Sequence, residues 1–106
     1  MFYEIRRYAA RPGHRDDWVN YMESVVLPYQ VSKGVHLVAS FIDLEDADGY
    51  VWIRRFDDEE SAARIGAAVY QDPAWVDDIG PKVHALIDAE KSVITRVAAT
   101  PGVPAL

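Results

Sequence analysis

The sequence predicts one α+β domain with the ferredoxin-like element order β-α-β-β-α-β, in which a four-stranded antiparallel sheet carries helices on one face. Its 106 residues suit one hydrophobic core, and its 50% hydrophobic and 11% aromatic content argues against disorder. Apolar residues alternate with period two in four segments and recur with helical spacing in the segments between them. Together these observations favour a small mixed domain.

The first strand and first helix follow from this change of period. Aromatic and branched residues alternate over residues 2–8, and the turn signal Arg11-Pro12-Gly13 ends the strand. A helix is expected over residues 14–32, where Leu27 falls on the polar side and should be exposed, and where Pro28 should kink or end the helix. The apolar stripe of this helix consists of Trp18, Val19, Tyr21, Met22, Val25, Val26 and Tyr29.

Two further strands and a helix follow. Residues 35–44 and 50–56 are strand-like and flank an acidic loop of about five residues, which predicts a hairpin. The next helix should run to about Tyr70, with Asp57 as its cap, because Asp57 and Glu60 have capping-box spacing.

The last helical region and strand complete the domain. Asp72-Pro73 has the form of an N-cap followed by proline at the first helical position. Gly80-Pro81 is expected to break this helix before it resumes to about Glu90. A strand over residues 92–97 follows. We therefore place one domain at residues 1–98 and a C-terminal tail at 99–106.

The predicted strands are apolar on both faces, whereas helices cover only one. In the second strand, Val35, Leu37, Ala39 and Phe41 alternate with residues of the opposite face, among them Val38 and Ile42. A second apolar face is rarely left open in a monomer. We therefore expect a homodimer whose two sheets pack face to face as one barrel, a dimeric α+β barrel.

Composition excludes several classes of partner. Seventeen acidic and eleven basic residues give a net charge of −6, which argues against nucleic acid and anionic membranes. No apolar run approaches the roughly 20 residues that span a bilayer, and the N-terminus lacks the features of a signal peptide. The absence of cysteine excludes disulfides and thiolate metal sites and fits a reducing compartment. A cytoplasmic protein is expected.

Several short motifs, in this order, resemble the NIPSNAP family over residues 2–97. They are Tyr3-Glu4-Ile5-Arg6-Arg7-Tyr8 with Arg11-Pro12-Gly13, Leu27-Pro28, Phe56-Asp57 before an acidic helix, and Asp72-Pro73-Ala74-Trp75 with Val83 to Ile87. The resemblance implies the dimeric α+β barrel fold, which cofactor-independent monooxygenases, muconolactone isomerases and haem-binding chlorite dismutases share. It implies no particular reaction. The family often has tryptophan where this chain has Arg54.

The first and third strands should form the central pair and so bring polar and aromatic residues onto one wall. Its candidate catalytic residues include Glu4, Arg6 and Arg54, because buried charges need partners or a ligand. One interpretation is an ion-pair network inside the dimer barrel, and the other is a ligand-orienting site. The candidate ligand-binding side chains of this wall are Tyr8, Tyr50 and Trp52.

Of the three histidines, His36 is the preferred proton acceptor because it alternates in phase with Val38, Ser40 and Ile42 and should face an enclosed surface. His14 and His84 are expected at helix surfaces. The three histidines are too scattered in the sequence for the spacing of a zinc site. Neither a phosphate-binding glycine loop nor a nucleophile motif is present. No cofactor and no metal are therefore expected.

Two hypotheses of function follow. In the first, a small aromatic or polyketide-like ligand lies between sheet and helices, as in a cofactor-independent oxygenase or isomerase. His36 would accept a proton, Arg54 or Arg6 would stabilise an enolate or phenolate, and Tyr8 and Trp52 would position the ring. In the second, the chain is a non-catalytic dimeric binding or scaffold module, favoured if Leu27 and the hairpin loop form an exposed patch outside the dimer.

Overall fold

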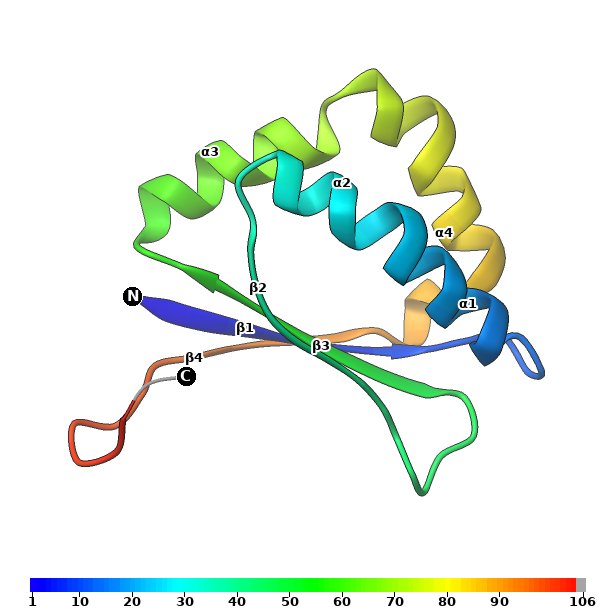
Figure 1. Cartoon of the computed structure of the whole chain (residues 1–106), viewed down its shortest axis with the longest axis horizontal. Helices are drawn as coiled ribbons and strands as arrows, with labels where there is room; N and C mark the ends of the chain where they lie inside the picture. The colour runs from blue at the N-terminus through cyan, green and yellow to red at the C-terminus, as the bar shows by residue number, and fades with distance from the viewer. Residues whose placement is uncertain (105–106) are drawn as a thin grey trace.

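A computed structural model describes residues 1–104 and confirms the ferredoxin-like order, with a sheet of strand order β2-β3-β1-β4 in which all neighbours are antiparallel. The helices lie together on one face of the sheet (Figure 1). We call this the inner face and the opposite one the outer face. The elements are β1 (Phe2–Ala9), α1 (Arg15–Tyr21), η1 (Met22–Val26), α2 (Leu27–Ser32), β2 (His36–Ile42), β3 (Gly49–Phe56), α3 (Glu59–Tyr70), η2 (Trp75–Ile79), α4 (Gly80–Leu86), η3 (Ala89–Lys91) and β4 (Val93–Val97).

The first and third strands form the central pair, as the sequence predicts. Phe2 pairs with Phe56, Glu4 with Arg54, Arg6 with Trp52 and Tyr8 with Tyr50, so polar and aromatic side chains alternate along one wall. The ring of Tyr8 contacts Trp18 of α1 at a centroid distance of 5.9 Å, which places this wall on the inner face.

The first helical region is continuous, and Pro28 neither ends nor interrupts it. The π-helical turn η1 precedes the proline, and Leu27 N donates to Met22 O, five residues back. A π turn contains one residue more than an α turn, so the side chains that follow are displaced by about one position. The prediction of an exposed Leu27 is therefore wrong: it is 7% exposed, and Gln30 is buried as well.

The strand β2 contains a similar irregularity. Its register on β3 shifts between Leu37 and Ala39, and a β-bulge places two residues opposite one. Because side chains alternate with period two, the bulge reverses which residues face the helices. His36, paired with Arg55, therefore lies on the outer face, whereas Ser40 lies on the inner face and its hydroxyl hydrogen-bonds the Tyr50 hydroxyl. The expectation that Leu37, Ala39 and Phe41 share one face is wrong for the same reason.

The second helical region also differs from the prediction in detail. Asp58, not Asp57, caps α3, since its Oδ1 accepts from Ser61 N at 2.7 Å. Asp72 caps the next helix as predicted, accepting from Ala74 N at 2.8 Å. Gly80-Pro81 does not break this helix, because the π turn η2 precedes the pair and Gly80 N donates to Trp75 O. The helix ends at Leu86 rather than near Glu90.

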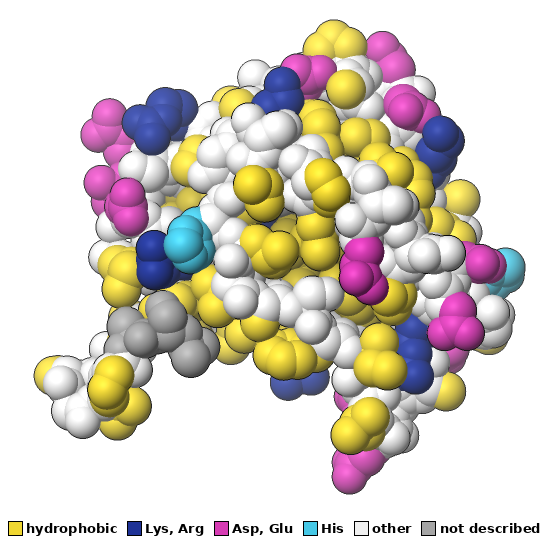
Figure 2. Space-filling view, viewed as in Figure 1, with side chains coloured by type: hydrophobic (Ala, Val, Ile, Leu, Met, Phe, Trp, Pro, Cys, Tyr) yellow, Lys and Arg dark blue, Asp and Glu magenta, His cyan; other side chains and the backbone are white. Residues whose placement is uncertain are grey.

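The core lies between the inner face and the helices, and includes Trp18, Met22, Val26, Tyr50, Trp52, Ile79, Val83 and Ile87. Apolar side chains also remain at the surface (Figure 2). Phe41 and Val93 are 53% and 54% exposed. Within residues 1–104, no helix has the length and apolar character needed to cross a membrane. The predicted tail at 99–106 is described as far as Pro104; its last two residues lie outside the described part.

Candidate functional site

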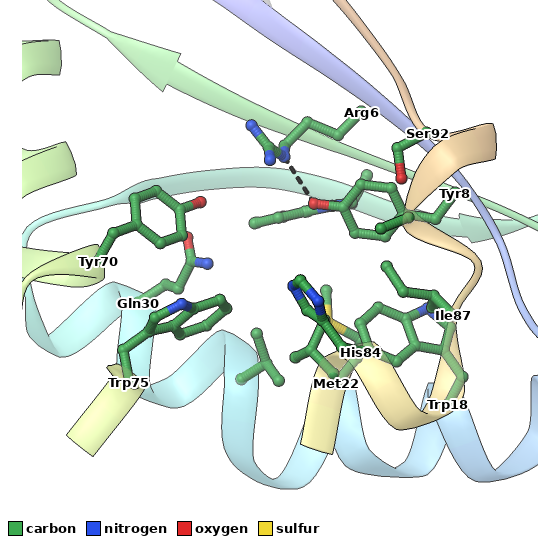
Figure 3. A pocket seen from close by; sticks show the side chains of 14 residues that line it. Arg6, Tyr8, Trp18, Met22, Gln30, Tyr70, Trp75, His84, Ile87 and Ser92 are labelled. Atoms are coloured by element: carbon green, nitrogen blue, oxygen red, sulfur yellow. Dashed lines mark hydrogen bonds between the residues drawn. The ribbon is translucent and has the colours of Figure 1, made fainter. Parts of the chain in front are cut away.

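A cavity of about 290 Å³ lies between the inner face and the two helical regions. Three indole rings line it, from Trp18, Trp52 and Trp75. Its polar lining groups are Arg6, Tyr8, Gln30, Tyr70, His84 and Ser92. Figure 3 shows Tyr70, Gln30 and Trp75 at one end, Trp18, Met22 and Ile87 at the other, and Arg6 with Tyr8 across the space from His84.

Behind the cavity, a buried carboxylate joins two arginines. Glu4 Oε1 accepts from Arg6 Nη1 at 2.5 Å, from Arg54 Nη2 at 2.6 Å and from Arg54 Nε at 3.1 Å. The cross-strand pairing of Glu4 with Arg54 and the i, i+2 spacing of Glu4 and Arg6 on one strand face place these groups together. Of the two interpretations from the sequence, the ion-pair and hydrogen-bond network is present, and it lies on the inner face.

The two arginines differ in what they have left to offer a ligand. Arg54 uses all three nitrogens: besides Glu4, it donates from Nη1 to Gln30 Oε1 at 2.8 Å and to the Tyr70 hydroxyl at 3.0 Å. Arg6 lines the cavity, donates from Nε to the Tyr8 hydroxyl at 2.8 Å, and has no hydrogen-bond partner for Nη2 within residues 1–104. Arg54 therefore positions other groups, whereas Arg6 keeps donors for a ligand.

The charges of the network are fixed at neutral pH. Burial opposes ionisation of Glu4, but the charge of Arg54 and the hydrogen bonds from both arginines outweigh it and lower the pKa of Glu4. For Arg6, burial acts to lower the pKa, yet Tyr8, Tyr70 and Glu4 raise it further above its ordinary value. Glu4 and Arg6 therefore remain ionised.

Tyr8 and Trp52 orient the guanidinium group of Arg6. Because Arg6 donates to the Tyr8 hydroxyl, that hydroxyl keeps its own hydrogen available for an acceptor in the cavity. The Arg6 guanidinium lies 5.6 Å from the Tyr8 ring centroid and 5.7 Å from that of Trp52. These contacts hold the cation between two ring systems.

The structure brings together only part of the predicted site. Arg6, Tyr8 and Trp52 line the cavity, and Glu4 and Arg54 support it from behind. Tyr50 is buried beside Trp18 and lines a different depression with Tyr8.

His36 lies outside the site, so the expectation that it faces an enclosed surface is wrong. It is exposed, and its Nδ1 lies 3.4 Å from Arg55 Nη2. It borders a separate surface depression near the start of α3. The bulge in β2, which period counting does not detect, is the physical cause.

Among the lining residues that were not predicted as site residues are the polar side chains Gln30, Tyr70, His84 and Ser92. His84 was expected only at a helix surface; it is exposed, but its imidazole points toward the space below Arg6 and Tyr8 (Figure 3). Gln30 and His84 each follow a π turn and a proline, at Leu27-Pro28 and Gly80-Pro81. Such prolines inside apolar helical patterns are the one signal in the sequence that pointed to an altered helix face.

The described residues contain no group of three or more His, Asp or Glu side chains arranged to hold a metal. The indole nitrogens of Trp18 and Trp52 are buried without a hydrogen-bond partner within residues 1–104. The chemistry that the cavity offers is therefore that of a cation, a phenol and an imidazole beside aromatic walls.

Comparison with known proteins gives one family and one fold. The family model described as NIPSNAP matches residues 3–101. Comparison with curated proteins found no match. The solved structure of Atu4242 from Agrobacterium tumefaciens is 25% identical in sequence to this chain, with a TM-score of 0.88. The alignment covers 100% of both chains.

Two other solved structures share the fold. A NIPSNAP domain protein from Burkholderia xenovorans is 16% identical, with a TM-score of 0.87 and coverage of 99% of this chain and 100% of that one. SnoaB from Streptomyces nogalater, described as a cofactor-independent oxygenase, is 14% identical, with a TM-score of 0.71 and coverage of 98% of this chain and 97% of the other. At these identities the likeness shows the fold alone.

Proposed function

The chain belongs to the NIPSNAP family, and from this premise we propose that it is a homodimer that binds a small aromatic or polyketide-like molecule. In this proposal it acts on that molecule as a cofactor-independent enzyme of oxygenase or isomerase type. The observation that carries the proposal is the cavity itself: three indoles enclose a space into which Arg6 and Tyr8 present hydrogen-bond donors. Aromatic walls with a few fixed polar groups are typical of small-molecule sites. SnoaB, which has this fold, is described as a cofactor-independent oxygenase, and it provides the precedent for the oxygenase form.

The size of the cavity favours small members of this ligand class. Its volume of about 290 Å³ lies just below the range of roughly 300–1,000 Å³ common for small-molecule sites. A ligand of one or two rings therefore suits it better than a larger polycyclic one.

The positions of His84, Arg6 and Tyr8 around the cavity support removal of a proton from the carbon next to a carbonyl group of the ligand. His84 is the side chain placed to accept the proton, and Arg6 with Tyr8 would donate to the carbonyl oxygen as it becomes an enolate. An isomerase would return the proton to another carbon, and an oxygenase would let the enolate react with molecular oxygen as co-substrate. The role first expected of His36 passes to His84.

Deuterium exchange tests this chemistry. The protein is incubated with a two-ring aromatic ketone such as 1-tetralone in D₂O, and loss of the α-proton signal is followed by NMR while an electrode records oxygen uptake. His84→Gln should slow the exchange about 10²-fold or more, as is usual when a general base is removed. His14→Gln, a change of another exposed histidine, is the control. Equal rates in both variants would contradict the assignment of His84.

The homodimer is supported by the apolar outer face, where Phe41 and Val93 are 53% and 54% exposed. Phe41→Asp should shift the protein toward monomer in sedimentation velocity at micromolar concentration. Val31→Asp replaces a side chain of α2 that is 51% exposed, away from the sheet, and should leave the mass unchanged. A monomeric wild-type protein under these conditions would refute the dimer.

The scaffold alternative loses the observation on which it depended. An exposed Leu27 would have favoured a partner-binding patch, but Leu27 is buried. Leu44, between β2 and β3, is 92% exposed, so a patch at the hairpin loop would not include Leu27.

A further inference from the structure

The buried network beside the cavity does not balance its own charge. It holds two guanidinium groups, Arg6 and Arg54, against the single carboxylate of Glu4. The lining residues of the cavity include no aspartate or glutamate. The network therefore carries one excess positive charge.

This excess charge is poorly hydrated. The side chains of Arg6, Glu4 and Arg54 are 14%, 8% and 5% exposed. Arginine does not escape the cost of burial by losing a proton, since its pKa lies too high. An uncompensated buried charge is unfavourable, and a bound anion would remove that cost.

The geometry also shows where such an anion would bind. The nitrogens of Arg54 are all committed to Glu4, Gln30 and Tyr70. Arg6 retains donors at Nη2, and the Tyr8 hydroxyl lies 2.8 Å from Arg6 Nε with its hydrogen available. Both groups face the cavity (Figure 3).

We propose that the cavity selects its ligand as an aromatic monoanion, whose acidic oxygen binds Arg6 and Tyr8 and completes the charge balance of the Glu4–Arg6–Arg54 network. The inference rests on the proposed function and specifies the charge of its ligand. Aromatic carboxylates and ionised phenols belong to this class, and so does the enolate that His84 would form from a ketone in the cavity. Their neutral isosteres bind more weakly.

A pair of ligands with the same shape tests the charge. 2-Naphthoate and 2-naphthamide are titrated into the protein by calorimetry at constant ionic strength. The naphthoate should bind at least about tenfold more tightly, as expected for a charged hydrogen bond in a buried site. Arg6→Met should abolish this preference. Arg7→Met, which removes a cation from the next position of the same strand on the outer face, should keep it.

A conservative variant keeps the test valid if Arg6→Met does not fold. Arg6→Lys retains the charge and should still prefer the naphthoate, though with weaker binding, because lysine lacks the planar fork of arginine. Equal binding of the two ligands to wild-type protein would overturn the inference and leave the small-molecule function standing. Binding of neither ligand would overturn both. An undiminished preference in Arg6→Met would overturn the assignment to Arg6.

Discussion

Replacing Glu4 by glutamine removes the one negative charge that holds two buried arginines. The carboxylate accepts three hydrogen bonds, two of them at 2.5 and 2.6 Å. Glutamine retains an oxygen acceptor but not the charge. Because loss of one partner leaves the other charges buried and uncompensated, the free energy of unfolding should fall by about 3–5 kcal/mol. For a domain whose total stability is typically about 5–15 kcal/mol, that is a large fraction.

Urea denaturation followed by far-ultraviolet circular dichroism measures this change. Glu59→Gln is the matched control, because Glu59 pairs with Arg96 through two hydrogen bonds at the surface. An exposed pair of this kind contributes at most about 1 kcal/mol. If Glu4→Gln lowers the free energy of unfolding no more than Glu59→Gln does, the buried network does not stabilise the fold.

The same variant predicts a pH dependence with a definite sign. In the folded protein, the pKa of Glu4 lies below its ordinary value of 4.5. A lowered pKa means that the carboxylate stabilises the fold above that value and that this stabilisation is lost as the pH falls through the folded-state pKa. The stability difference between wild type and Glu4→Gln should therefore be constant near neutral pH and shrink in acid below about pH 4.5. A difference that stays constant into acid would rule out this account of the ionised network.

Two further pairs of variants test local features. A Cβ at Gly80 would lie 2.9 Å from Trp75 O and 3.0 Å from Trp75 Nε1, so Gly80→Ala should destabilise the fold by about 1–3 kcal/mol. A Cβ at Gly66 would have no neighbour within 4 Å, so Gly66→Ala should stabilise the fold by about 0.5–1 kcal/mol. If thermal melts rank the two variants in the opposite order, the close approach of Gly80 to Trp75 in η2 is contradicted. Asp58→Ala should lower the melting temperature by a few degrees through loss of the α3 cap, and Asp57→Ala should not. A larger effect at Asp57 would restore the capping assignment made from the sequence.

Much of the fold was predictable because the spacing of hydrophobic residues along a segment indicates whether that segment forms a strand or a helix. Strand alternation gave the strands, and the chemical match of Glu4 with Arg54 and of Tyr8 with Tyr50 agrees with the register of β1 on β3. The family resemblance agrees with the match over residues 3–101. These properties depend on regular repeats, which a single sequence shows.

The site was predictable only where the repeats stay regular. The bulge in β2 and the π turns η1 and η2 each insert one residue, and each changes the face on which later side chains lie. For this reason His36 was placed inside and Leu27 outside, and His84 was not chosen. Arg6, Tyr8 and Trp52, which lie on uninterrupted strands, were placed correctly.

The position of the tryptophans makes the protein its own spectroscopic probe. The chain has three tryptophans, and all three line the cavity. Indole emission therefore reports on the cavity alone, with no background from tryptophan elsewhere in the chain. Trp18 is fully buried and Trp75 is partly exposed, so a quencher dissolved in water should reduce the emission of Trp75 more strongly than that of Trp18. A ligand that fills the cavity can thus be followed by the change in emission of the unlabelled protein.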